Sequence, residues 1–209
     1  MSGASFFFFL FLFLIILFSD SYCHPFHFFQ DSIPDIVYSL VWILEDKNGA
    51  VSSIAADVAI KLFSAIPNAL LKPFILDLSH ALSCLLPARQ IQTSAACATA
   101  LNLILSNVPS KSEEALWEIL KKTEVVLHLI GTIKDFSGAM NPVEYIQPLF
   151  SLLSIILSRW PLSRFPVWSD AKLMEGLYDM YAKPDFSVRA EVLKLYSAIG
   201  NECGGIFIH

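Results

Sequence analysis

The chain has 209 residues, of which 55% are hydrophobic and 16% are charged, and its formal net charge is −5 at pH 7. This apolar and mildly acidic composition excludes a disordered or collagen-like chain, and it lacks the clustered lysines and arginines of a nucleic-acid-binding surface. The four cysteines are scattered without CxxC spacing, which suits a reducing compartment and small buried thiols at Cys84 and Cys97. We therefore expect a folded domain that needs no disulfide, metal or cofactor for stability.

The first thirty residues differ in composition from the rest. They contain ten of the 17 phenylalanines, one acid (Asp20) and no lysine or arginine. Residues 6–18 have the length of a signal-peptide core but lack a basic flank, and they are short for a membrane span. Their residues can also all be written with pyrimidine-rich codons, as at the end of an intron. The segment 1–30 is therefore either signal-like or mispredicted, and we treat 200–209 as an irregular tail under the same suspicion.

Residues 31–199 carry apolar residues at steps of three and four, which is the period of amphipathic helices. In chain order, we expect helices over about 33–45, 53–67, 70–86, 94–109, 113–135, a region around 149–151, 169–182 and 187–199. Ser110 and Glu113 have the spacing of a capping box. Pro73 and Pro148 should start, kink or break a helix. The segment 160–168 has no helical period, and it predicts an ordered loop packed by its two tryptophans.

An internal repeat organises these helices. The string Ala-Ile-Lys-Leu-Phe-Ser-Ala-Ile at 59–66 returns as Val-Leu-Lys-Leu-Tyr-Ser-Ala-Ile at 192–199, a separation of 133 residues or three periods of about 44. A second copy is obtained by laying Leu62 on Leu103 with one residue inserted, and a third by laying Leu62 on Leu149. The pattern predicts an all-α solenoid of stacked helix pairs, preceded by the apolar segment.

Histidine and cysteine side chains offer few candidates for chemistry. Residues 23–27 contain Cys23, His24 and His27, three possible metal ligands where a structural zinc site needs four, and we interpret the cluster as accidental. His80 and His128 are lone histidines in apolar helices. Asp77 lies three residues before the first of these histidines and Glu124 four before the second, spacings that favour helix support over catalysis.

Two groups of charged residues are further candidates for a site. Glu113, Glu114, Glu118, Lys121 and Lys122 have the spacing of a solvated helix face. A second group either forms a polar binding strip at one end of the stack or is ordinary exposed surface; its members are Asp170, Lys172, Lys183, Asp185 and Arg189. No GxSxG, HExxH, Walker or dinucleotide motif is present. We predict no catalytic, cofactor-binding or metal-binding residues; an enclosed pocket joining a histidine to a carboxylate would revive an enzyme.

The alanine-rich phrases 53–67, 94–109 and 187–199 resemble armadillo-type repeats. More narrowly, Val-Trp-Ile-Leu at 41–44 followed by Ile-Ala-Ala-Asp at 54–57 is similar to the helical-repeat region of large plant BTB/POZ proteins. The resemblance implies that a BTB part recruits a cullin-3 ubiquitin ligase while the repeats hold the substrate. No BTB segment can be identified in this chain, so it would supply only the binding arm.

The prediction is therefore a non-catalytic interaction scaffold for a protein or peptide ligand, located in the cytoplasm, with no nucleic-acid partner. The alternative is a membrane-anchored or secreted helical protein whose residues 1–30 are a genuine targeting segment. We also hypothesise that 31–199 is an internal piece of a longer repeat protein. Uncovered apolar flanks on its terminal helices would then make the isolated chain poorly soluble.

Overall fold

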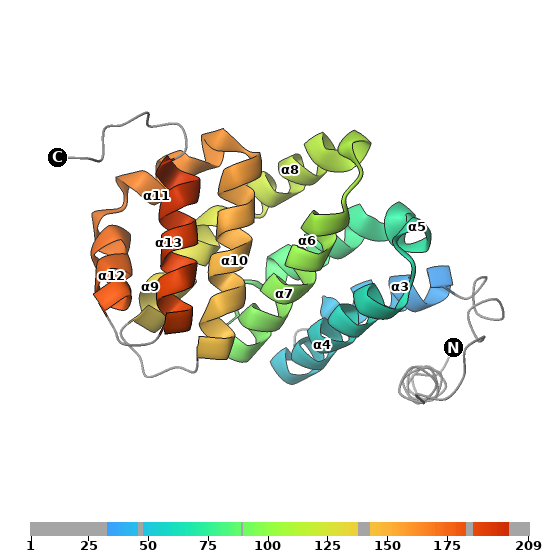
Figure 1. Ribbon diagram of the computed structural model, residues 1–209. Coiled ribbons are helices and arrows are strands. Elements are labelled where there is room, and N and C mark those ends of the chain that lie inside the picture. Colours follow the sequence, from blue (N-terminus) through green and yellow to red (C-terminus); the bar gives the residue numbers. More distant parts are fainter. Residues whose placement is uncertain (1–32, 46–47, 89, 138–142, 183–185, 201–209) are drawn as a thin grey trace.

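The computed structural model describes residues 33–45, 48–88, 90–137, 143–182 and 186–200 (Figure 1). All regular structure in these ranges is helical, as the sequence predicts. The segment 1–30, its Cys23–His27 cluster and the tail beyond residue 200 lie outside the described residues.

Four long helices form the first of two layers, which we call the long-helix row. They are α4 (Gly49–Ala65), α7 (Ile91–Asn107), α10 (Val143–Arg159) and α13 (Phe186–Gly200). Each packs against the next in chain order, and Figure 1 shows α4, α7, α10 and α13 following one another across the molecule from cyan to red. The predicted solenoid is confirmed by this order.

A second layer of helices covers one face of the row. It consists of α3 (Ile33–Leu44), α6 (Ile75–Leu85), α8 (Glu113–Lys122), α9 (Val125–Ser137) and α12 (Ala171–Ala182). Helices α3, α6, α9 and α12 each pack against the long helix that follows them, while α8 bridges α6 and α9. The remaining elements are short: α5 (Asn68–Leu71), η2 (Lys72–Phe74), η3 (Ser110–Ser112), η4 (Pro161–Ser163) and α11 (Arg164–Ser169).

The predicted equivalence of 59–66 and 192–199 is confirmed, because the two strings lie in the first and last helices of the row. Leu62 and Leu195 are both fully buried, and so are Ala59 and Val192. Adding 42, 94 or 133 to a residue number in α4 gives the equivalent residue in α7, α10 or α13. Each buried residue of α4 then falls on a buried residue of α7 and α10, and Val58, Ala59 and Leu62 fall on buried residues of α13 as well. Leu62 then shares its position with Ile104, Ile156 and Leu195, each at most 1% exposed.

This register corrects the two inner copies. Leu62 corresponds to Ile104 rather than Leu103, which is only partly buried, so no residue has to be inserted. In α10 it corresponds to Ile156 rather than Leu149, so the third copy was laid seven residues, about two helical turns, too early. The seven-residue shift keeps the apolar period, and residues 103, 104 and 105 of α7 are all apolar, which is why the sequence pattern exposed neither error.

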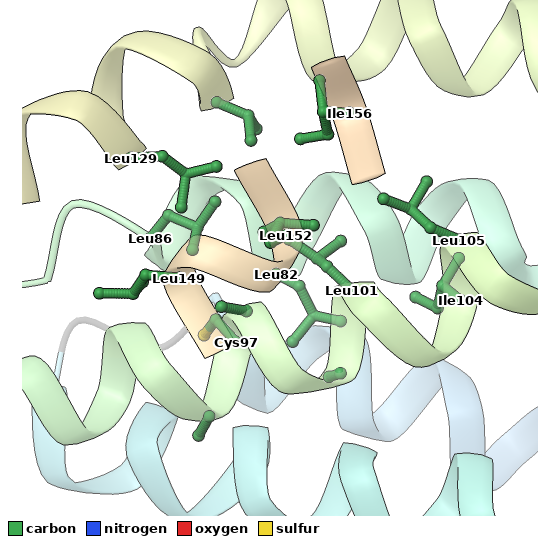
Figure 2. Packing of buried hydrophobic residues seen from close by; sticks show 14 of the residues in the cluster. Leu82, Leu86, Cys97, Leu101, Ile104, Leu105, Leu129, Leu149, Leu152 and Ile156 are labelled. Carbon is green, nitrogen blue, oxygen red and sulfur yellow. The ribbon is translucent and has the colours of Figure 1, made fainter. Parts of the chain in front are cut away.

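The core lies between the two layers. Leu82 and Leu86 from the α6 region, Cys97 and Leu101 from α7, and Leu152 from α10 gather there (Figure 2). All five side chains are at most 1% exposed. Full burial stabilises a leucine by roughly 1.5–3 kcal/mol, so this shared core is what holds successive hairpins together.

The predicted helix 113–135 is broken. It ends at Lys122 and restarts at Val125, because Glu124 adopts a left-handed backbone with φ of 50°. The backbone N–H and the hydroxyl of Thr123 both bond to the Ile119 carbonyl and close the first helix. Left-handed backbone usually falls on glycine or asparagine, so this break could not be predicted from a glutamate at this position.

The segment 160–168 is not a loop: it forms η4 and the start of α11. Pro161 and Pro166 lie in the first turns of these helices, where a missing backbone N–H costs little. Trp160 stacks on Trp117 of α8, with ring centroids 5.1 Å apart and planes inclined by 14°. Of the two tryptophans predicted to pack the segment, Trp160 therefore packs on another helix, and the side chain of Trp168 lies outside the described part of the structure.

The other predicted helix boundaries were confirmed in one place and wrong in others. Pro73 lies in η2, so the predicted helix 70–86 is interrupted there as expected. Pro148 lies inside α10, which runs through it. The capping box is wrong: Ser110 opens η3, and Ser112, at the N-cap of α8, makes no side-chain capping bond. Within the described ranges, no helix is long and apolar enough to cross a bilayer.

Candidate interaction groove

A hollow of about 490 Å³ opens on the long-helix row, and its lining comes from α7, α10 and α13. Serines make up half of the ten lining residues, namely Ser106, Ser151, Ser154, Ser158 and Ser197. Three charged residues, Arg159, Glu191 and Lys194, complete its polar surface. We call this site the serine groove.

Serine recurs at one position in all four long helices. Ser64, Ser106, Ser158 and Ser197 coincide in the register that aligns the buried residues, and all four are exposed. The first three hydroxyls donate to the carbonyl four residues earlier, over 2.8–2.9 Å. A hydroxyl that donates to its own helix keeps lone pairs free, so this serine column presents hydrogen-bond acceptors to solvent.

Glu191 departs from the pattern of the core. Its position holds Val58 in α4, Ala100 in α7 and Leu152 in α10, all buried. Glu191 is itself only 4% exposed. Its Oε1 accepts hydrogen bonds from Lys194 Nζ at 2.7 Å and from Gln147 Nε2 at 3.4 Å. A buried carboxylate costs free energy that an apolar residue would not, so Glu191 is a candidate for function rather than for stability.

Two further features give the groove its electrostatic character. The Ser154 Oγ atom is buried and has no hydrogen-bond partner among the described residues. Ser64, Ser106 and Ser158 lie in the last turns of their helices, where the carbonyl ends of the helix dipoles favour positive charge. Arg159 is already paired with Glu113 at 3.9 Å and Lys194 with Glu191. The arrangement therefore offers acceptors to a ligand that carries donors.

The lone histidines do not form a catalytic site. His80 and Asp77 are both exposed on α6. The His128 Nδ1 atom is buried without a hydrogen-bond partner among the described residues, and Glu124 lies in the left-handed break before α9. In the described ranges, no three His, Cys, Asp or Glu side chains are grouped as metal ligands.

The predicted charge group on α8 is a solvated face, although its pairing differs from the expected one. Glu118 and Lys121 form an exposed ion pair at 2.6 Å, three residues apart, whereas the sequence suggested Glu118 with Lys122. Cys97 is buried, as expected, and burial together with the nearby Asp57 carboxylate raises its pKa to about 12. Cys84 is exposed, so the prediction of a buried thiol is wrong there.

The proposed polar strip is not assembled. Asp170 lies just before α12, whereas Arg189 donates to the Tyr181 carbonyl at the end of that helix, at 2.9 Å. A helix of 12 residues is about 18 Å long, which keeps the two groups apart. Lys172 is exposed, and Lys183 and Asp185 lie outside the described residues. Asp170 instead has a structural role.

Replacing Asp170 by alanine is expected to cost about 1 kcal/mol at neutral pH. Its Oδ1 accepts from the Leu173 N–H and its Oδ2 from Lys134 Nζ, both at 2.9 Å. Lys134, followed by the Leu173 N–H, holds the pKa of Asp170 below its ordinary value. Because the folded-state pKa is lowered, the stabilisation is present above about pH 4 and is lost as the pH falls through the folded pKa. Thermal melts of the two proteins should therefore converge in acid. Asp179→Ala, an exposed change on the same helix, should leave the melting temperature unchanged at every pH.

Neither the serine column nor Glu191 was predicted from the sequence. Both signals were present in the sequence, but each becomes visible only when the copies are aligned in the register that the structure shows. In the predicted register, Ser64 of the first copy fell on Ser151 of the third, a residue of the groove but not of the column.

Helix hairpins stacked in register, with a polar groove across successive long helices, define an α-solenoid of the armadillo type. Comparison with protein families agrees, since the plant ARM repeat family matches residues 88–201. The chain belongs to the plant ARM repeat family, a class of interaction scaffolds.

Two similar proteins extend this result. A BTB/POZ domain-containing protein of Arabidopsis thaliana is 41% identical over 170 residues, which cover 81% of this chain and 17% of that protein. The chain thus spans less than a fifth of the relative's length. A crystal structure of an engineered protein has a TM-score of 0.60 at 19% identity, covering 79% of this chain and 62% of that one. This second likeness shows the fold alone.

Proposed function

We propose that the chain is a non-catalytic scaffold that binds an extended, basic segment of a protein partner along the serine groove. Neighbouring helices lie about 8–10 Å apart, so the serine column spans roughly 24–30 Å from Ser64 to Ser197. An extended peptide of about nine residues has this length. Its backbone N–H groups match the serine acceptors.

The buried carboxylate of Glu191 carries the proposal of a basic ligand. Its present partner, the Lys194 side chain, is 65% exposed and can move aside without disturbing the core. A lysine or arginine from the partner would then pair with Glu191 at the floor of the groove. We propose this exchange as the central recognition event.

Blocking the groove tests the proposal. Arginine at Ser158 and Ser197 fills the hollow from two exposed positions, and Ser169→Arg is the matched change at an exposed serine outside it. The unmodified chain and the Ser169→Arg variant should capture the same partner from plant extract. The Ser158→Arg, Ser197→Arg variant should recover at least tenfold less of that partner. Equal recovery by all three would refute the groove as the binding site.

Peptides test the ligand chemistry. Nine-residue windows of a captured partner are scanned for binding, and each lysine or arginine in the best window is replaced by alanine. One such replacement and Glu191→Gln should each weaken binding about tenfold, and together they should weaken it no further. If the two losses of affinity are additive, Glu191 does not pair with the basic residue, and the proposed exchange is wrong.

We also propose that this binding arm serves a ubiquitin-ligase adaptor, on the strength of the relative that carries a BTB/POZ domain. A fusion of the chain to that domain should direct ubiquitin transfer to the captured partner in a reconstituted reaction. The Ser158→Arg, Ser197→Arg fusion should not. Transfer at the same rate with the blocked groove would exclude this role.

We propose a cytoplasmic location, supported by the two free thiols in the described ranges. The alternative, a membrane-anchored or secreted protein, depends on residues 1–30 acting as a targeting segment. A fluorescent fusion separates the two. Diffuse cytosolic signal supports the scaffold, whereas a reticular or extracellular signal that disappears on deletion of residues 1–30 supports the alternative.

A further inference from the structure

Arg159 lines the serine groove and has unused hydrogen-bond donors. It is the last residue of α10, and its side chain is 31% exposed. Its ion pair with Glu113 of α8 joins atoms 3.9 Å apart, which is longer than a hydrogen bond. Within the described ranges, its guanidinium makes no hydrogen bond. A guanidinium has five N–H donors, and the group that it binds best is a carboxylate held by two parallel hydrogen bonds.

The charges of the groove favour a ligand that brings such a carboxylate. The lining contains two cations, Arg159 and Lys194, and one carboxylate, Glu191. A basic ligand residue that replaces Lys194 at Glu191 adds a third cation to this lining. A ligand with basic residues alone therefore increases the excess of positive charge. Because like charges brought together at an interface cost free energy, a complementary ligand also carries an acid.

Arg159 is better placed than Lys194 to receive this acid. It follows Ser158 of the serine column directly in the chain, and it is half as exposed as Lys194, whose side chain is 65% exposed. The lysine side chain can turn into solvent once its partner is taken. The arginine stays at the wall of the groove, where a less hydrated ion pair is screened less by salt.

The register of the lining sets the spacing of the two ligand charges. In this register Arg159 of α10 lies seven residues, or two turns, farther along the helix direction than Glu191 of α13. The two positions are about 10.5 Å apart along the axis and about 8–10 Å apart across the row, or roughly 13–15 Å in all. Four residues of an extended segment span about 13 Å, and two residues span about 7 Å where long side chains reach the rest of the way. Residues an even number apart lie on the same side of an extended chain, so both charges then face the groove.

We infer that the ligand segment carries an aspartate or glutamate that binds Arg159, two or four residues from the basic residue that pairs with Glu191. The inference rests on the proposed function of the groove. A side chain rather than a chain terminus supplies the carboxylate, because the segment continues past α10 toward Ser106 of α7. The ligand carboxylate takes the place of the long contact between Arg159 and Glu113. The partner is thus recognised by a segment of mixed charge, and not by a run of lysines or arginines.

Paired substitutions in the protein and the peptide test this contact. The probe is the nine-residue window of a captured partner that binds the full chain best, and each aspartate or glutamate in it is replaced by asparagine or glutamine. One such replacement, two or four residues from the essential basic residue, should weaken binding about fivefold, and so should Arg159→Gln. Together the two changes should weaken it no further. Arg159→Glu should bind the peptide with lysine at that position more tightly than it binds the original peptide.

Lys172→Gln is the matched control, because it removes an exposed lysine outside the groove and changes the net charge equally. It should bind the peptide like the unmodified chain. The inference is overturned by a best window that has no acid at either spacing, by additive losses, or by an equal loss with Lys172→Gln. The coupling between Glu191 and the basic ligand residue is measured separately with the same peptide. If that coupling persists while Arg159→Gln has no effect, the carboxylate contact is wrong and the proposed function stands.

Discussion

Replacing Phe150 by alanine is expected to cost about 3–5 kcal/mol of unfolding free energy, a large fraction of the roughly 5–15 kcal/mol typical of a domain. Phe150 is the largest of the fully buried side chains, and it lies in α10 between α7 and α13. Its removal leaves a cavity at the centre of the row, which the packed neighbours cannot fill without moving. Chemical denaturation followed by circular dichroism measures the loss.

The matched control for this change is Tyr178→Ala, which removes an aromatic ring from an exposed site. It should alter the free energy of unfolding by no more than about 0.5 kcal/mol. The account of the core is wrong if the two alanine variants unfold at the same denaturant concentration.

Glu191→Leu is expected to act in the opposite direction, raising the free energy of unfolding by about 1–4 kcal/mol while abolishing ligand binding. The other three long helices hold Val58, Ala100 and Leu152 at this position, so leucine fits the pattern of the core. Replacing a buried ion pair by apolar packing is often neutral or stabilising by this amount. Thermal melts together with partner capture give both readouts.

Lys194→Met separates the charge from the packing. This change leaves the Glu191 carboxylate buried without its closest cation, so it should lower stability where Glu191→Leu raises it. If Glu191→Leu destabilises the protein, the carboxylate is part of the structure and the functional interpretation fails.

The fold could be predicted from the sequence because the repeated string and the apolar period have the same physical cause. Each helix buries one face against its neighbours. The strings 59–66 and 192–199 were therefore placed correctly at the two ends of the row. A shift by two turns keeps that period, so Leu149 fitted the pattern as well as its true equivalent. Leu103 fitted because residues 103, 104 and 105 are all apolar.

Local backbone events were not predictable from the same signals. The break at Glu124 requires a left-handed residue with no glycine to announce it. The helix through Pro148 tolerates a residue that usually interrupts one, in a segment packed on both sides by other long helices. In both places tertiary packing outweighs local preference.

The groove was missed for a different reason. A single serine at 64, 106, 158 or 197 does not indicate a binding surface by itself. Glu191 likewise looks like an exposed acidic residue until the buried residues at its position in the other helices are known. Only their shared position in four parallel helices makes them a surface. Function in such an array is encoded across copies, and it becomes visible once the register is fixed.

Distances between spin labels test the tandem arrangement most directly. Spin labels are attached to pairs of introduced cysteines, one at Ser64 and the other at Ser106, Ser158 or Ser197. The four native cysteines of the chain are replaced first. The account predicts separations that grow with each helix crossed, from about 8–10 Å to roughly 16–20 Å and then 24–30 Å, before the length of the label itself is added. A distance from Ser64 to Ser197 no longer than that from Ser64 to Ser158 would contradict the row of helices and the groove built on it.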